Sequence, residues 1–129
     1  MVHPRRLLLS LILGSMLLLL AACPKQEVVT AENAPQDPIA VALSQGAALI
    51  DVRTPKEFAS GHLPGAINLP SGAAVDVNAF PQDTPIVLYC KSGRRATGVL
   101  KKLEAAGRND VYNMGGVDDG ERYGLTPKK

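Results

Sequence analysis

Cys90 is the residue whose setting in this chain best suits chemistry. It ends an apolar stretch, residues 86–90, whose side chains favour a β-strand, and apolar residues at helical spacing begin shortly after it. The short basic turn between the two consists of Lys91, Ser92, Gly93, Arg94 and Arg95. The sequence therefore predicts a strand, a loop and a helix, with the cysteine where strand and loop meet.

A strand–loop–helix unit of this kind stabilises negative charge at the end of its strand. The N–H groups of the loop and the unsatisfied amides of the first helical turn point towards that place, and Gly93 is expected to take a positive φ. Cys90 should therefore ionise more readily than a free cysteine, and the thiolate is the nucleophilic form. The alternative is that Cys90 is simply a small hydrophobic residue at the end of a buried strand.

The elements that must position Cys90 follow from the apolar pattern of the chain. Thr54 and Glu57 have the spacing of a capping box at the start of a short helix. Residues 71–80 are ambiguous and allow one helical turn. We expect strands at residues 47–52, 66–69, 86–90 and 110–114, and helices at residues 38–46, 55–60 and 96–106.

Strands that alternate with helices predict an α/β fold, a small doubly wound parallel sheet with helices on both faces. Sites in such sheets lie outside the carboxyl ends of the strands, where Asp51, Cys90 and Gly115 fall. The domain is expected to span residues 37–129, which is enough for one modest core.

Residues 1–22 have the pattern of a secretory signal peptide. Arg5 and Arg6 precede an almost wholly apolar run that ends in small residues before Cys23. An uncleaved membrane helix is the alternative, but about 20 apolar residues are needed to span a bilayer, and this run breaks at Cys23. Residues 23–36 are polar and are expected to form a flexible linker.

The segment Leu20-Ala21-Ala22-Cys23 resembles the processing box of bacterial lipoproteins. The resemblance implies cleavage before Cys23 and lipidation of that cysteine, so that acyl chains anchor the protein to a membrane. The predicted location is the cell envelope, facing the periplasm. The chain has two cysteines, so lipidation of Cys23 would leave Cys90 without an intramolecular partner.

The charge balance argues against nucleic acid as a partner. The chain has 14 Lys and Arg against 12 Asp and Glu, and loss of Arg5 and Arg6 with the signal peptide would leave 12 of each. A nucleic-acid surface requires a net basic domain with aromatic side chains for stacking, and only 4% of the residues are aromatic.

Four ordered segments resemble the signatures of the rhodanese family: residues 49–58, 61–70 and 90–95, and the pair Gly115-Gly116. The similarity covers essentially the whole domain and is greatest to the small single-domain rhodaneses of the bacterial periplasm, which are thiosulfate:cyanide sulfurtransferases. It implies that a thiolate takes a sulfane sulfur from thiosulfate or a similar anion and releases sulfite. The persulfide then passes the sulfur to cyanide or a thiol. Neither a metal nor an organic cofactor is implied.

This resemblance makes Cys90 the nucleophile and persulfide carrier. The amides of residues 91–95 would hold the outer sulfur, with Ser92 and Gly93 contributing backbone. The candidates for binding the sulfonate of thiosulfate are Lys91, Arg94 and Arg95, of which Arg95 is favoured. The family pattern gives Asp51, Arg53 and His62 structural places, with Arg53 in an ion pair.

Loop length separates this chain from phosphatases and arsenate reductases of related fold. Those enzymes place five residues between cysteine and arginine, whereas four stand before Arg95, the form associated with sulfur transfer. The alternative of another class is a docking or sulfur-relay module in which Cys90 only accepts a persulfide. Asp118 and Asp119 near the mouth are expected to disfavour small anions, and Tyr123 is expected to replace a tryptophan common in relatives.

Overall fold

The computed structural model describes residues 35–72 and 75–129. The predicted signal peptide, Cys23 and the predicted linker up to residue 34 lie outside the described residues. In the described part, no helix has the length and apolar character needed to cross a membrane. The elements are α1 (Pro38–Ser44), β1 (Ala48–Asp51), α2 (Pro55–Ser60), β2 (Ile67–Asn68), the 3-10 helix η2 (Val77–Ala79), β3 (Ile86–Cys90), α3 (Arg94–Ala105), β4 (Val111–Gly116) and the 3-10 helix η3 (Val117–Tyr123).

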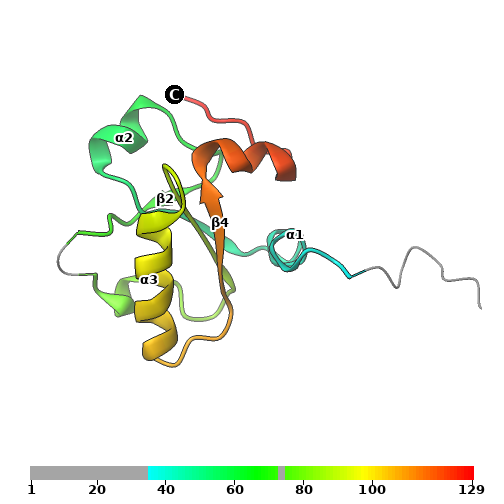
Figure 1. Ribbon diagram of the computed structural model, residues 1–129, viewed down its shortest axis with the longest axis vertical. Coiled ribbons are helices and arrows are strands. Elements are labelled where there is room, and N and C mark those ends of the chain that lie inside the picture. The colour runs from blue at the N-terminus through cyan, green and yellow to red at the C-terminus, as the bar shows by residue number, and fades with distance from the viewer. Residues whose placement is uncertain (1–34, 73–74) are drawn as a thin grey trace, which may run out of the picture. The chain divides into compact units, whose positions relative to one another are not determined.

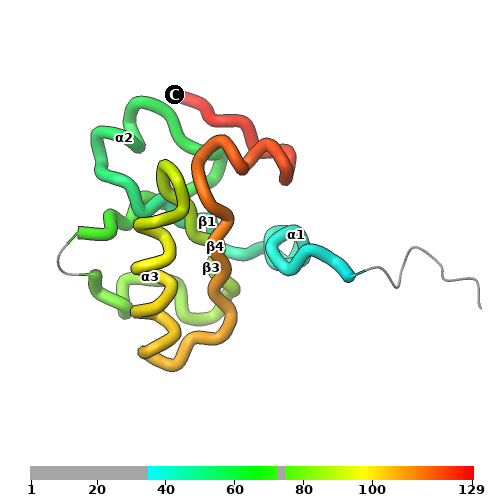
Figure 2. The backbone as a smooth tube through the Cα atoms, viewed as in Figure 1, coloured from blue at the N-terminus to red at the C-terminus, as the bar shows by residue number. Residues whose placement is uncertain are grey.

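Four parallel strands form one sheet in the order β2-β1-β3-β4. Figures 1 and 2 show α3 and α1 on opposite sides of the strands. All five residues of β3 are buried, as a strand covered on both faces requires. The predicted α/β fold with a doubly wound parallel sheet is confirmed.

Each face of the sheet has its own apolar core. Because side chains alternate along a strand, β3 sends Cys90 to the side of α3 and Tyr89 to the side of α1. The core under α3 includes Ile50, Val52, Leu88, Val99 and Leu103. The core under α1 includes Ala42, Leu49, Leu63, Val87 and Met114. Cys90 is therefore fixed by a packed core on one side and by its strand neighbours on either flank.

The start of α2 follows from the local sequence. The Thr54 side chain accepts a hydrogen bond from the Glu57 N–H at 3.2 Å, and the Glu57 carboxylate accepts one from the Thr54 N–H at 3.0 Å. This reciprocal pair is the predicted capping box, which satisfies two amides that would otherwise lack partners. The predicted bounds of α2 and β3 are confirmed.

The structure differs from the predicted elements at several boundaries. Helix α3 begins at Arg94, two residues early, so both arginines of the predicted loop belong to its first turn. Strand β4 continues to Gly116 after a register shift opposite Leu88 and Tyr89. β2 has only two residues, η2 supplies the helical turn within residues 71–80, and η3 was not predicted.

A buried ion pair joins β1 to the end of α2. The Arg53 Nη2 lies 2.6 Å from the Asp51 Oδ2, and the Arg53 Nε donates to both carboxylate oxygens at 3.0 Å. The same Nη2 donates to the Gly61 carbonyl at 2.7 Å, and the guanidinium lies 5.7 Å from the centre of the Tyr89 ring. The predicted ion pair of Arg53 is confirmed, with Asp51 as its partner.

We expect Asp51→Asn to lower the free energy of unfolding by about 3 kcal/mol, because it leaves the Arg53 guanidinium buried without its carboxylate. Urea denaturation measures the loss. Asp110→Asn is the matched control, since the Asp110 side chain is 42% exposed in its pair with Arg108 and the expected loss is about 1 kcal/mol or less. Equal losses in the two variants would show that burial is not what makes the first pair important.

Candidate active site

Cys90 lies at the carboxyl end of β3 with 1% of its surface exposed. The N–H of Gly93 donates to its Sγ at 3.0 Å. Gly93 precedes α3 and has φ +86° and ψ −18°, so the predicted positive φ is confirmed. This left-handed conformation turns the chain back towards the strand and directs the amide at the sulfur.

Two opposing effects set the pKa of Cys90. Burial raises the pKa of the thiol, whereas the backbone amides of Ala96, Ser92, Arg95 and Gly93 lower it by stabilising the thiolate. The amides prevail, and the pKa of Cys90 lies below that of an ordinary cysteine. The Ala96 amide is an addition to the predicted residues 91–95. It takes part because the helix starts at Arg94 and leaves the N–H groups of its first turn free.

Asn113 of β4 holds the loop in place. Its Nδ2 donates to the Gly93 carbonyl at 3.0 Å and to the Thr97 Oγ1 at 2.9 Å. Its Oδ1 accepts from the Gly115 N–H at 2.9 Å. Asn113 was not among the predicted site residues, because a side chain that holds the backbone of another segment in place leaves no sequence motif of its own. Its position two residues before Gly115 was the available signal.

The glycine pair of β4 lets the two backbones approach closely. A Cβ on Gly116 would lie 2.5 Å from the Lys91 carbonyl oxygen, a contact that real side chains do not make. A Cβ on Gly93 would lie 3.1 Å from the Gly115 Cα. The loop that holds the sulfur therefore rests directly on the backbone of β4.

Arg95 forms a bidentate ion pair with Glu57. Its Nη1 and Nη2 each lie 2.8 Å from a carboxylate oxygen, Oε2 and Oε1 respectively. The ion pair raises the pKa of Arg95, and the nearby Cys90 thiolate raises it further. The same ion pair holds the pKa of Glu57 well below its usual range. The arginine favoured for sulfonate binding is thus close to the sulfur, with its charge matched by a carboxylate.

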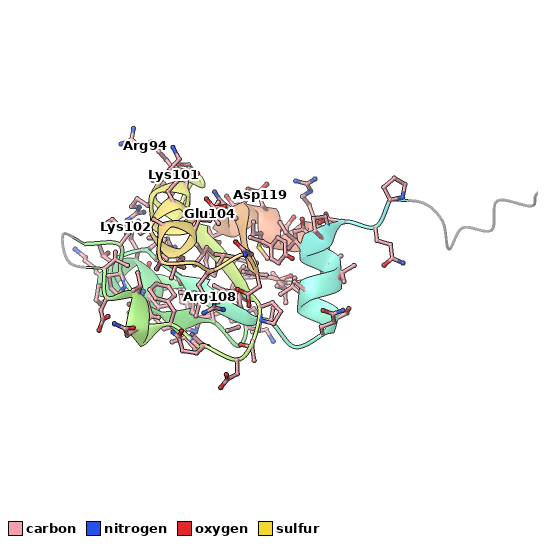
Figure 3. All side chains as sticks on the ribbon, turned by 90° about the horizontal axis from the view of Figure 1, so that it is seen from below. Arg94, Lys101, Lys102, Glu104, Arg108 and Asp119 are labelled. Atoms are coloured by element: carbon pink, nitrogen blue, oxygen red, sulfur yellow. The ribbon has the colours of Figure 1, made fainter. Side chains whose placement is uncertain are left out.

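The predicted loop also contains exposed residues, although the backbone amide of one of them, Ser92, acts on Cys90. Lys91, Ser92 and Arg94 are exposed, and Figure 3 shows Arg94 pointing away from the body of the domain at the start of α3. The ion pairs among residues 35–72 and 75–129 include neither Lys91 nor Arg94. The substrate-binding role of residues 91–95 stays a prediction.

Two acidic residues were expected at the mouth, and one of them contacts the backbone beside the loop. The Asp119 Oδ2 accepts from the Gly116 N–H at 2.6 Å, whereas Asp118 is exposed. Tyr123 packs in the core under α1 and donates to Asp37 at 2.9 Å. It therefore lies across the sheet from the core that contains Cys90.

His62 has the contacts of a structural residue, as predicted. Its Nδ1 lies 2.9 Å from the Phe58 carbonyl oxygen, and its ring stacks on the Phe58 ring with centroids 3.7 Å apart. Its backbone pairs with Lys128. Within the residues that the structure describes, no group of three His, Cys, Asp or Glu side chains could hold a metal ion.

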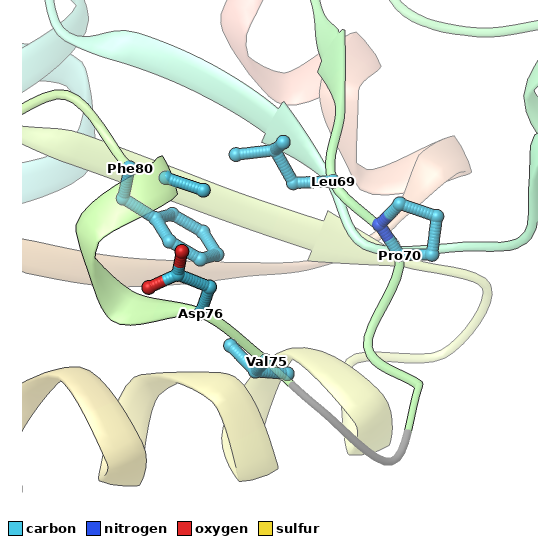
Figure 4. A pocket seen from close by; sticks show the side chains of 6 residues that line it. Leu69, Pro70, Val75, Asp76 and Phe80 are labelled. Atoms are coloured by element: carbon cyan, nitrogen blue, oxygen red, sulfur yellow. The ribbon is translucent and has the colours of Figure 1, made fainter.

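A pocket of about 200 Å³ lies between the segment after β2 and η2, as Figure 4 shows. Its lining is mostly apolar, and its one carboxylate, that of Asp76, already accepts from the Asn78 N–H at 2.9 Å. None of residues 90–95 lines it. The lining residues are Leu69, Pro70, Val75, Asp76, Ala79 and Phe80. This pocket supplies no group to the cysteine.

We expect Gly93→Ala to raise the pKa of Cys90, because an alanine disfavours φ +86° and its Cβ would press on Gly115, moving the amide away from the sulfur. The free energy of unfolding should fall by about 1–2 kcal/mol. Iodoacetamide alkylates only the thiolate, so in Gly93→Ala the alkylation rate should increase at a higher pH than in the wild type.

Gly98→Ala is the matched control for this substitution. Gly98 lies in α3, where a Cβ would meet no atom within 4 Å, and alanine should stabilise the helix by roughly 0.5–1 kcal/mol. The pKa of Cys90 should not change in this variant. An unchanged pKa in Gly93→Ala would contradict the role assigned to the Gly93 amide.

Comparisons with known proteins show what this chain is similar to. The family model of the rhodanese-like domain matches residues 36–121. A sulfurtransferase of Allochromatium vinosum is 37% identical over 79 residues, covering 60% of this chain and 74% of the relative. The thiosulfate sulfurtransferase GlpE of Pseudomonas syringae is 34% identical over 73 residues, covering 56% of this chain and 69% of the relative.

Solved structures show the same architecture. A rhodanese with anions from E. coli has a TM-score of 0.50 and 32% identity, with 57% of this chain and 89% of that chain covered. A rhodanese-related protein from Thermoplasma volcanium has a TM-score of 0.58 and 21% identity, with 69% and 93% covered, a likeness that shows the fold alone. The match over residues 36–121 establishes that the chain belongs to the rhodanese family.

Proposed function

We propose that this protein is a sulfurtransferase that carries a sulfane sulfur on Cys90 as a persulfide. The observation that carries the proposal is the cysteine at the end of β3, with an amide 3.0 Å from its Sγ and a lowered pKa. A thiolate stabilised in this way is a nucleophile, and the same amides suit the negative charge of a persulfide. The names of the two relatives, sulfurtransferase and thiosulfate sulfurtransferase, support the same activity.

The first half-reaction transfers sulfur to the protein. The Cys90 thiolate attacks the outer sulfur of thiosulfate or a similar donor, and a bond forms between Sγ and that sulfur. The S–S bond of the donor breaks, and sulfite leaves with the electron pair. The charge of the reactants is conserved in the persulfide anion and sulfite, so this step needs neither an oxidant nor a cofactor.

The second half-reaction returns the thiolate. Cyanide or a thiolate acceptor attacks the outer sulfur of the persulfide, and the bond between that sulfur and Sγ breaks. The products are thiocyanate, or a new persulfide on the acceptor, and the Cys90 thiolate. The exposed cations Lys91 and Arg94 attract anionic reactants towards the loop.

We expect the wild-type protein to form sulfite and thiocyanate from thiosulfate and cyanide, and Cys90→Ser to form neither, because a serine hydroxyl does not ionise in this setting. Product assays measure turnover. With thiosulfate alone, intact mass should show one added sulfur atom on the wild type and none on the variant. A folded, reduced wild type that is inactive with every sulfane donor contradicts the proposal. Stoichiometric sulfur capture without turnover would favour a relay module.

We also propose that the protein is anchored to a membrane through lipidated Cys23 and works in the cell envelope, facing the periplasm. The support is the sequence alone: a basic start, an apolar run, and small residues before Cys23.

Cys23→Ala should move the protein from the membrane fraction to the soluble fraction or leave the signal peptide uncut, because the acyl chains have no other attachment. Fractionation of cells that express each form, with mass analysis of the amino terminus, measures both outcomes. Ser44→Ala, an exposed change in the domain, is the control and should fractionate as the wild type does. Unchanged fractionation of Cys23→Ala with normal cleavage would remove the lipoprotein assignment.

A further inference from the structure

The charges around Cys90 are more nearly balanced than the basic turn suggests. Arg95 is engaged at both Nη atoms by Glu57, each at 2.8 Å. The side chains of the two residues are only 35% and 32% exposed, so water screens the pair in part. A site that contains Arg95 together with Glu57 offers little net charge to an incoming anion.

Glu57 is held so that it cannot easily release Arg95. Its Oε2 accepts from the Thr54 N–H and the Thr54 Oγ1, both at 3.0 Å, in addition to Arg95. Rotation of the carboxylate away from the arginine would therefore also break the capping box of α2. The ion pair is part of a fixed local structure, so binding of an anion would have to compete with it.

The remaining charges beside the loop do not restore a strongly positive site. Asp119 places a carboxylate oxygen 2.6 Å from the Gly116 N–H, where β4 approaches the carbonyl of Lys91. Asp118 next to it is exposed, and Arg94 points away from the domain. The two exposed cations of the loop, Lys91 and Arg94, are thus matched in number by the two acidic residues that follow Gly116.

Sulfane donors differ in charge. Thiosulfate has two negative charges, one of them on a sulfonate group that is bonded directly to the attacked sulfur and needs cationic partners. The persulfide of a small thiol has at most one charge on its reacting sulfurs, and the carboxylates of glutathione persulfide lie several bonds away from them. We propose that Glu57 is a specificity-determining residue, which by neutralising Arg95 makes the Cys90 site prefer low-molecular-weight thiol persulfides to thiosulfate as donors. This inference rests on the proposed sulfurtransferase function.

The reaction with such a donor is balanced. The Cys90 thiolate attacks the outer sulfur of the donor persulfide, and a bond forms between Sγ and that sulfur. The S–S bond of the donor breaks, and the donor thiol leaves with the electron pair and takes up the proton of the outer sulfur. Cys90 is left as the persulfide anion, the same intermediate that thiosulfate would give.

Glu57→Gln tests the proposal, because glutamine can also complete a capping box, while the variant removes the charge and the acceptor oxygen that faces the Arg95 Nη2. Freed from its carboxylate, Arg95 can bind the sulfonate. We expect kcat/KM for thiosulfate to rise about tenfold, mainly through KM, and kcat/KM for glutathione persulfide to change less than about threefold. The pKa of Cys90, measured by iodoacetamide alkylation, should fall, because the positive charge of Arg95 near the thiolate is no longer neutralised by a carboxylate.

Two further variants separate a charge effect from a structural one. Glu104→Gln removes the same charge from an exposed position in the last turn of α3, about 15 Å along the helix from its start. This variant should leave kcat/KM unchanged for both donors. Arg95→Gln added to Glu57→Gln should abolish the gain with thiosulfate, since the freed guanidinium is its cause.

The outcomes distinguish this inference from the function on which it rests. A wild type with a higher kcat/KM for thiosulfate than for glutathione persulfide overturns the inference and leaves the sulfurtransferase function intact. A Glu57→Gln variant that loses activity with both donors, with a raised pKa of Cys90, shows a structural role and also overturns it. Absence of turnover with either donor in the wild type contradicts the proposed function itself.

Discussion

The structure depends on one electrostatic contact, in which the amino end of α3 faces the sulfur of Cys90. The Gly93 N–H lies 3.0 Å from Sγ, and the amides of Ser92, Arg95 and Ala96 add to it. This end of a helix carries partial positive charge, so the two arginines of its first turn are placed where cations are disfavoured. A thiolate at Cys90 and the carboxylate of Glu57 supply the negative charge that makes the arrangement favourable.

The rest of the fold keeps that contact rigid. β3 is buried along its whole length, and Cys90 belongs to the core that packs under α3, so strand and helix cannot shift independently. Asn113 ties the Gly93 carbonyl to β4 through a bond of 3.0 Å, and the absence of a side chain at Gly116 lets β4 lie against Lys91. The amides already point at the sulfur, so they need not rearrange when the thiolate forms. Preorganisation of this kind is what lets hydrogen-bond donors stabilise charge in a reaction.

Local sequence predicted the features whose causes are local. The capping box of Thr54 and Glu57, the strand that ends at Cys90 and the positive φ of Gly93 each depend on a few neighbouring residues. Features that join distant segments were missed: the Arg95–Glu57 pair spans 38 residues, and the bonds from Asn113 to Gly93 span 20. The 3-10 helix η3 was missed because its glycine and acidic residues carry no apolar period.

Glu57 shows why a residue assigned by local pattern can have a second role. The capping box alone accounts for a glutamate at position 57, so the neighbouring sequence does not indicate that Glu57 also pairs with a residue of α3. In the folded chain the same carboxylate starts α2 and neutralises Arg95, which joins two of the segments that resemble family signatures. Because one oxygen accepts from both Thr54 and Arg95, the start of α2 and the charge beside Cys90 are fixed together. The charge offered to a donor is therefore set by the geometry of a helix cap as well as by the number of basic residues in the loop.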